Sequence, residues 1–340
     1  MRAIVVHEPG KMTLDQWEMP QITAPDEVLV KIRYAGICGS DVGVYTGKNP
    51  YAVYPVVIGH EASGEIISVG EDVKDLKEGD AVVFEPIRYC GKCYACRTGA
   101  HNVCRHLKVL GCIENGTFRD YAVFPRSQVH KFDTGKMSFK QAALCEPYTI
   151  GMQANSRGNV MEGDTVLVHG AGPIGLIVAD VARLRGAKVI ISEPNEERLA
   201  LAAKFGIEHR VNPLKQDLDK YVFDLTDGEG VNVVFDAAGL PAIISHAVEL
   251  LSPAGRFVPM TYGKEPIPVN FQVINAKALT ILGTRHQYEK FPEVVELLPT
   301  ILDHVDLLTT HVFDADDFMD AFDTLASPST NSCKVLLQFS

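Results

Sequence analysis

The feature that most constrains the fold is a glycine-rich turn placed between a predicted strand and a predicted helix. Residues 165–169 form a short apolar segment, and apolar residues then recur at helical spacing over 174–184. Between them the chain reads Gly-x-Gly-x-x-Gly, a spacing that permits a tight turn and the close backbone approach that a dinucleotide pyrophosphate needs. The sequence therefore predicts a dinucleotide site made by Gly170, Gly172, Pro173, Ile174 and Gly175.

Three further residues extend this predicted cofactor site. Glu193 ends the next strand, 21 residues after Gly172, where a carboxylate bonds the adenosine ribose hydroxyls and repels a 2′-phosphate. Arg198 is open to three interpretations: it packs on the adenine, neutralises a phosphate, or is a solvated arginine on a helix face. Asp236 ends a later strand and is expected to line the cofactor cleft. Glu193 favours NAD over NADP, although an Arg198 that neutralised a phosphate would oppose this.

Strands and helices alternate from about residue 160 onward. Strands are predicted at 188–192, 231–235, 256–259 and 279–283, and helices at 195–205 and 241–251. This alternation is typical of βαβ units in a parallel sheet. Residues before about 150 instead show short strands (28–34, 65–69 and 81–84) between dense Gly and Pro turns. After 283, a helix at 291–302 and a strand at 334–339 fit either part.

Length and charge narrow the function. A chain of 340 residues suggests about two domains. Its net charge of −11 argues against a nucleic-acid binder or a basic membrane-surface protein. The sequence has neither a secretory signal pattern nor an apolar run long enough to span a membrane. We expect a protein of the reducing cytoplasm.

Eight cysteines are unevenly distributed, and half of them lie in one short segment. Four thiolates at such spacing can converge on one tetrahedral Zn²⁺ with no open position. The alternative, two disulfides, suits the expected compartment poorly. The sequence predicts a structural zinc site made by Cys90, Cys93, Cys96 and Cys104.

A second set of possible ligands is scattered: Cys38, His60, Glu61 and Glu146. A thiolate, an imidazole and one or two carboxylates suit a zinc ion that keeps a free position for a substrate. Each residue alone is more simply explained as structural or solvated.

Several motifs together resemble one family. The run Gly59-His60-Glu61-Ala-Ser-Gly64, followed by Gly70 and Val73, joins Cys38-Gly-Ser-Asp41 and the cysteine loop. The chain is thereby identified as a member of the zinc-dependent medium-chain alcohol/polyol dehydrogenases. The resemblance implies the α/β class, with a mostly-β GroES-like catalytic domain (1–149 and 284–340) around a Rossmann NAD-binding domain (150–283) with a doubly wound parallel sheet. It also implies two Zn²⁺ per chain, NAD, and a homodimer or homotetramer.

The resemblance also assigns roles. Cys38 and His60 are zinc ligands, and Glu61 and Glu146 compete for the third protein position. Classical alcohol dehydrogenases have a cysteine at the position of Glu146, so a glutamate there indicates the polyol and sugar-acid branch. Asp41 orients a ligand, and Ser40 passes the substrate proton outward. One departure is Gly43, where family members often carry a relay histidine.

The sequence indicates the substrate less directly than it indicates the fold, the metals or the cofactor. Arg285, in Gly283-Thr284-Arg285-His286, is placed to pair with a carboxylate, or else it touches the cofactor or the domain interface. Other candidate cations are Lys48, Arg88 and Arg119. Several stretches resemble a bacterial sugar-acid subgroup, the RspB-type and hexonate 5-dehydrogenases. This implies oxidation of a hexonate such as L-gulonate or L-galactonate to the keto acid, with sorbitol-type polyols and L-threonine as alternatives.

Two functions of other classes predict different sequence features. A non-catalytic zinc- and nucleotide-binding regulator should have lost the ligands of the open site, and all are present. A zinc-free quinone reductase of the same superfamily should lack Cys38, His60 and the cysteine loop.

Overall fold

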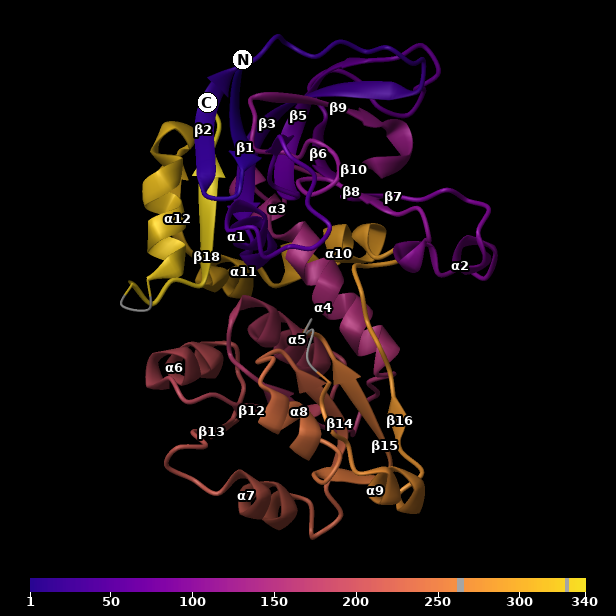
Figure 1. Cartoon of the computed structure of the whole chain (residues 1–340), viewed down its shortest axis with the longest axis vertical. Coiled ribbons are helices and arrows are strands. Elements are labelled where there is room, and N and C mark those ends of the chain that lie inside the picture. Colours follow the sequence, from indigo (N-terminus) through magenta and orange to yellow (C-terminus); the bar gives the residue numbers. More distant parts are fainter. Residues whose placement is uncertain (262–265, 328–329) are drawn as a thin grey trace. The chain divides into compact units, whose positions relative to one another are not determined.

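The structure is a computed structural model that describes residues 1–261, 266–327 and 330–340. The chain divides into two compact units. The first comprises Met1–Glu146 with Tyr288–Ser340, and the second comprises Pro147–Gln287. In Figure 1 the first unit contains the indigo and yellow ends of the chain, and the two termini meet there, with Arg2 Nη2 3.5 Å from Ser340 Oγ.

The second unit is built on a six-stranded sheet in which every pairing is parallel. Its order is β13-β12-β11-β14-β15-β16, so the direction of winding reverses between β11 and β14. This confirms the predicted Rossmann sheet, whose ligands bind where the order reverses. The strands are β11 (Thr165–His169), β12 (Lys188–Ser192), β13 (His209–Val211), β14 (Val231–Asp236), β15 (Leu251–Pro259) and β16 (Thr280–Ile281).

Helices connect these strands: α5 (Pro173–Leu184), α6 (Glu196–Lys204), α7 (Leu218–Leu225), α8 (Pro241–His246) and α9 (Phe271–Ala276), after α4 (Cys145–Arg157) enters the unit. Local chemistry sets their starts, as where the Asn195 side chain accepts from the amides of Glu197 and Arg198. The helix predicted over 241–251 is too long, because α8 ends at His246. Residues 247–250 instead form a largely buried turn whose Leu250 carbonyl accepts from the Val231 amide.

The first unit is mostly β. A seven-stranded sheet has the order β10-β6-β5-β3-β18-β17, with β9 also on β3, beside a three-stranded sheet β2-β1-β4 and the pair β7-β8. The strands are β1 (Arg2–Glu8), β2 (Lys11–Gln16), β3 (Glu27–Ile37), β4 (Val56–Val57), β5 (Glu61–Val69), β6 (Ala81–Phe84), β7 (Ile87–Arg88), β8 (Lys108–Val109), β9 (Tyr121–Pro125), β10 (Val129–Lys131), β17 (Thr309–Asp314) and β18 (Lys334–Gln338).

The C-terminal tail packs into this unit. Strand β18 pairs antiparallel with β3, and the ring of Phe291 stacks on that of His130 with centroids 5.0 Å apart. The predicted helix at 291–302 is shorter and broken, because α10 ends at Leu297 before a 3₁₀ turn containing Pro299. The helices of this unit are α1 (Gly39–Tyr45), α2 (Tyr94–Arg97), α3 (Phe139–Ala142), α10 (Phe291–Leu297), α11 (Leu302–Leu308) and α12 (Phe318–Ala326).

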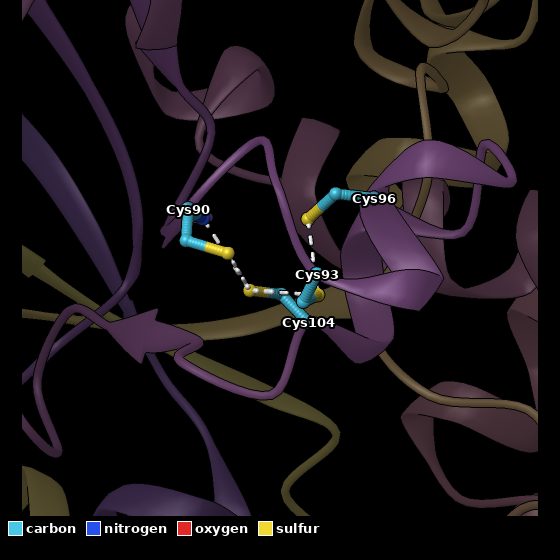
Figure 2. A group of neighbouring side chains, drawn as sticks. All are labelled: Cys90, Cys93, Cys96 and Cys104. Atoms are coloured by element: carbon cyan, nitrogen blue, oxygen red, sulfur yellow. Dashed lines mark hydrogen bonds between the residues drawn. The ribbon is translucent and has the colours of Figure 1, made fainter.

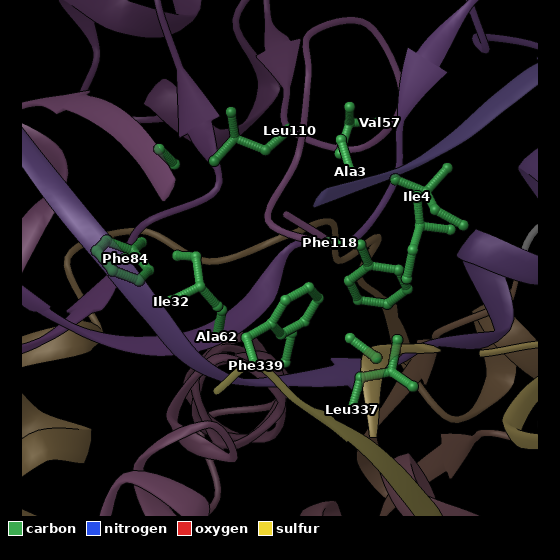
Figure 3. Close-up of a cluster of buried hydrophobic side chains, with 14 of the residues drawn as sticks. Ala3, Ile4, Ile32, Val57, Ala62, Phe84, Leu110, Phe118, Leu337 and Phe339 are labelled. Atoms are coloured by element: carbon green, nitrogen blue, oxygen red, sulfur yellow. The ribbon is translucent and has the colours of Figure 1, made fainter. Parts of the chain in front are cut away.

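One hydrophobic core joins both ends of the chain. Phe118 and Ile32 pack with Leu337 and Phe339 from the tail (Figure 3), and all four are fully or almost fully buried. Burying such side chains stabilises the fold by about 1.5–3 kcal/mol each. Among the described residues, no helix is both long enough and apolar enough to cross a membrane.

Candidate metal and cofactor sites

The four clustered cysteines converge on one point. In Figure 2 their sulfur atoms face one another, with Cys96 on the short helix α2 and the others on the surrounding loop. The Sγ atoms of Cys93 and Cys96 are 3.5 Å apart, as are those of Cys90 and Cys104, and Cys93 and Cys104 are 3.8 Å apart.

The distances between these sulfur atoms fit a shared metal ion and not disulfide bonds. A tetrahedral Zn²⁺ with Zn–S bonds of about 2.3 Å places its sulfur atoms about 3.8 Å apart, whereas a disulfide requires about 2.05 Å. The eight cysteines of the chain are all free thiols. The loop therefore fits a closed four-thiolate metal site, which leaves no position for a substrate.

A second group of possible ligands lies where β3 ends and β5 begins. Cys38 follows β3 and is the N-cap residue of α1, while His60 and Glu61 stand at the start of β5. One ligand atom from each of the three lies within 4.8 Å of the others. This mixed set of sulfur, nitrogen and oxygen suits a metal that keeps a free coordination position.

Asp41 organises this group. Its two carboxylate oxygens accept from the amides of Cys38 (2.8 Å) and Gly59 (3.1 Å), and Oδ1 is 3.4 Å from His60 Nδ1. Pairing at Nδ1 leaves Nε2 as the nitrogen available to a metal, as in carboxylate–histidine–metal arrangements. Burial opposes the charged imidazole, but the Asp41 carboxylate and Cys38 outweigh it and raise the pKa of His60. The Ser40 hydroxyl lies 3.4 Å from Nε2.

Glu61 has a partner that the sequence analysis did not identify. The Lys334 ammonium donates to both Glu61 carboxylate oxygens, at 2.5 Å from Oε1, and to the Ile37 carbonyl at 3.3 Å. Burial disfavours the ammonium, but Glu61 and Cys38 outweigh it and raise the pKa of Lys334. The sequence signal that could have indicated this partner is a lysine directly before three apolar residues of a strand.

Glu146 lies near this group but not within it. It is buried in the first turn of α4 and is not one of the three residues whose ligand atoms lie within 4.8 Å of one another. Burial raises its pKa to about 7, and the charges of His60 and Glu61 also act on it. Both glutamates thus stay candidates for the metal.

The glycine-rich turn has the shape that a dinucleotide needs. Gly170 has a φ of +92°, which favours glycine, and a Cβ on Gly175 would collide with the Gly170 carbonyl. A Cβ on Gly172 would meet no atom within 4 Å. The turn is therefore tight on one side and open at Gly172, just before the N-terminus of α5, where a pyrophosphate binds in this motif.

The acidic residues near this turn are both bound to backbone amides. Glu193 accepts from Ala171 (2.8 Å) and Asn195 (3.0 Å), with Arg198 Nη1 3.9 Å from Oε2. Asp236 accepts from the amides of Ala238 and Gly239, and its other oxygen accepts from Thr261 Oγ1 at 2.9 Å. Glu193 is thus fixed beside the glycine turn, whereas Asp236 shapes the turn after β14.

The candidate substrate cations differ in their surroundings. Arg88 donates to Glu114, which Lys108 also binds, so its charge is already neutralised. Burial lowers the pKa of Arg119 to about 10, and Lys48 is exposed on the surface. Arg285 is half-buried in the second unit.

Two family profiles match the chain. The family profile of the alcohol dehydrogenase GroES-like domain matches residues 24–134, and that of zinc-binding dehydrogenases matches residues 173–300.

Individual relatives match along the whole chain. The starvation-sensing protein RspB of Escherichia coli (strain K12) is 39% identical over 100% of both chains, and L-threonine 3-dehydrogenase of Pyrococcus horikoshii is 35% identical over 99% of both. A crystal structure of RspB from E. coli CFT073 complexed with NADH has a TM-score of 0.93 at 38% identity, covering 100% of this chain and 99% of that one.

Proposed function

The chain belongs to the zinc-dependent medium-chain alcohol and polyol dehydrogenases, and from this premise we propose that it oxidises a secondary alcohol of a sugar acid to the keto acid. It is an NAD-dependent dehydrogenase acting on an alcohol group of a small molecule. The sugar acid, a hexonate such as L-gulonate or L-galactonate, is the proposed refinement.

The observation that carries the proposal is the contrast between the two metal groups. The four cysteines leave no open position, whereas Cys38, His60 and a carboxylate leave one. We assign the first group to a structural Zn²⁺ and the second to a catalytic one, with Glu61 or Glu146 as the third protein ligand. When bound, the metal would lower the pKa of the substrate alcohol, and NAD would accept the hydride.

The protein's own residues then bind, orient and move a proton. Asp41 lies on the Nδ1 side of the His60 ring, so Nε2 is directed away from the Asp41 carboxylate. Ser40 Oγ lies beside Nε2, and we assign it the role of accepting the substrate proton. Gly43 offers no side chain to continue the relay, so the proton must leave Ser40 through water or another group. Ile174, Gly175 and Pro173 at the start of α5 would hold the pyrophosphate.

The sugar-acid proposal rests on Arg285, a half-buried cation of the second unit, and on the sequence stretches that resemble the RspB-type sugar-acid subgroup. A second candidate, L-threonine, is favoured by the Pyrococcus relative. Both substrates carry a carboxylate as well as a secondary alcohol, so one arginine could recognise the carboxylate of either through paired hydrogen bonds. A sorbitol-type polyol lacks that carboxylate.

Arg285→Ala separates acids from polyols. We expect kcat/KM for hexonates to fall by about 10- to 100-fold, since a hydrogen bond to a charged group contributes about 1.5–3 kcal/mol, with little change for sorbitol. NAD reduction is measured with hexonates, L-threonine and polyols, and Arg210→Ala, at another half-buried arginine of the second unit, is the matched control. Equal losses on every substrate would instead assign Arg285 to the cofactor.

Glu193→Ser tests the cofactor preference. Without the carboxylate, a 2′-phosphate is no longer repelled and Arg198 can neutralise it. We expect KM for NAD to rise about 10-fold or more and NADP to become a usable cofactor. The control is Glu197→Gln, an exposed acid on α6, with thermal unfolding to detect damage to the glycine turn. Unchanged cofactor kinetics would contradict this role.

We also infer a homodimer or homotetramer. Strand β16 is an edge of the second unit's sheet, and both of its residues are exposed. Such an edge is a template for pairing with another chain.

A further inference from the structure

A buried ion pair joins two strands of the first unit's seven-stranded sheet, and one of its members, Glu61, belongs to the candidate catalytic group. Glu61 starts β5 and Lys334 starts β18, and the two strands flank β3. The side chains of Glu61 and Lys334 are 2% and 4% exposed. The pair therefore lies inside the protein, and the two side chains meet across the intervening strand β3.

Gly36 on β3 makes this crossing possible. It is the register partner of Glu61 on one side and of Leu336 on the other. A Cβ on Gly36 would collide with Glu61 Oε2 and would lie 3.4 Å from Leu336 Cδ2. The missing side chain thus leaves the passage through which the Glu61 carboxylate reaches Lys334.

The ammonium is also fixed to the backbone beside Cys38. Its third hydrogen bond goes to the carbonyl of Ile37, the residue before Cys38. An ammonium has three donors, so two carboxylate oxygens and one carbonyl satisfy it fully. Lys334 is therefore held in place, and its charge lies beside a carboxylate that has an oxygen within 4.8 Å of the ligand atoms of Cys38 and His60.

We propose that Lys334 is a positioning residue that limits how strongly Glu61 binds the catalytic metal, and so keeps a coordination position available to the substrate. This inference rests on the proposed function. A carboxylate that shares its electron density with an ammonium is a weaker metal ligand than a free one, and a fixed positive charge also repels a divalent cation. Without Lys334, Glu61 would bind the metal more tightly, and with Glu146 as the third protein ligand it would take the position otherwise open to the substrate.

The test measures metal release as well as activity. Zinc transfer from the purified holoenzyme to a chromophoric chelator is followed in wild type, Lys334→Met and Lys334→Gln, with Lys334→Arg as the charge-preserving control. The Cys38→Ser variant identifies which release phase belongs to the open site. Cobalt substitution adds a spectrum that reports the coordination number. The glutamine of Lys334→Gln is neutral but keeps N–H donors for Glu61 and Ile37. This variant therefore tests the same charge effect if Lys334→Met fails to fold.

We expect both neutral variants to release the open-site metal about 10-fold more slowly, because they remove a fixed positive charge that repels the metal and they free the Glu61 carboxylate. The kcat of the neutral variants falls by a similar factor, while their KM for NAD is unchanged. Their cobalt spectrum shifts to that of a higher coordination number. Lys334→Arg, which keeps the charge, stays near wild type in all of these measurements. The double variant Lys334→Met/Glu61→Gln should regain fast release, because the strengthened ligand is gone.

An unchanged or faster release in the neutral variants overturns the proposal, and so does a double variant as slow as the single one. These readouts require no substrate. If wild-type protein held no metal in the open site, the proposed function itself would fail, whatever Lys334 does.

Discussion

Replacing Cys38 by Ser or His60 by Ala is expected to lower kcat by about 1000-fold or more, since the metal supplies several kcal/mol of transition-state stabilisation. NADH binding should change by no more than about twofold. The reason is that both residues belong to the first unit, whereas the glycine turn and Glu193 belong to the second. Steady-state rates and NADH fluorescence titration measure the two effects separately.

The matched control for this prediction is Cys112→Ala. Cys112 is a buried thiol of the first unit, to which the half-buried Cys38 also belongs, but Cys112 is in neither metal group. Its variant should keep most of the activity. If Cys38→Ser or His60→Ala, verified for metal content, turned over at the wild-type rate, the assignment of the catalytic site would be wrong.

Cys93→Ala is expected to have the largest effect on stability. Cys93 Sγ contacts two of the other three thiols, so its loss opens the closed site. Losing a structural metal is among the mechanisms that cost a protein about 4 kcal/mol or more. For a unit of this size that corresponds to a fall in Tm of about 10 °C. Differential scanning calorimetry measures the fall in Tm. Zinc analysis measures the metal content, which is expected to drop from two ions to one per chain.

The activity of Cys93→Ala distinguishes a brace from a catalyst. Because the four-thiolate site leaves no position for a substrate, activity at low temperature should persist in the fraction that stays folded. Cys112→Ala again serves as the thiol control. A variant with an unchanged melting temperature and unchanged zinc content would contradict a metal site in this loop.

The local parts of the fold followed from local patterns. Strands β11 and β12 lie where the apolar segments predicted them, because each is a short buried run bounded by turn residues. The predicted helix at 241–251 was too long because a buried apolar turn has no periodicity that separates it from a helix. The tail after residue 283 fitted either domain, because pairing partners of a strand are not encoded in its own pattern.

The metal sites show the same division. Cys90, Cys93, Cys96 and Cys104 lie close in the sequence, so their spacing alone predicted a shared metal. Cys38 and His60 required the resemblance to a family. Glu61 and Glu146 remained equivalent in the sequence, and the structure separates them by giving Glu61 a lysine partner and placing it with Cys38 and His60.

By itself, the sequence determined the strands and helices around the dinucleotide turn, the turn itself and the four-thiolate loop, because each depends on residues within one short segment. The GroES-like domain required the resemblance to a family. Only the tertiary structure revealed the pair of Glu61 and Lys334, which are 273 residues apart in the chain. That pair exists because β18 returns to lie beside β3, and because Gly36 leaves room for a carboxylate to cross it. Such an electrostatic contact depends on distance in space, which no spacing along the chain encodes.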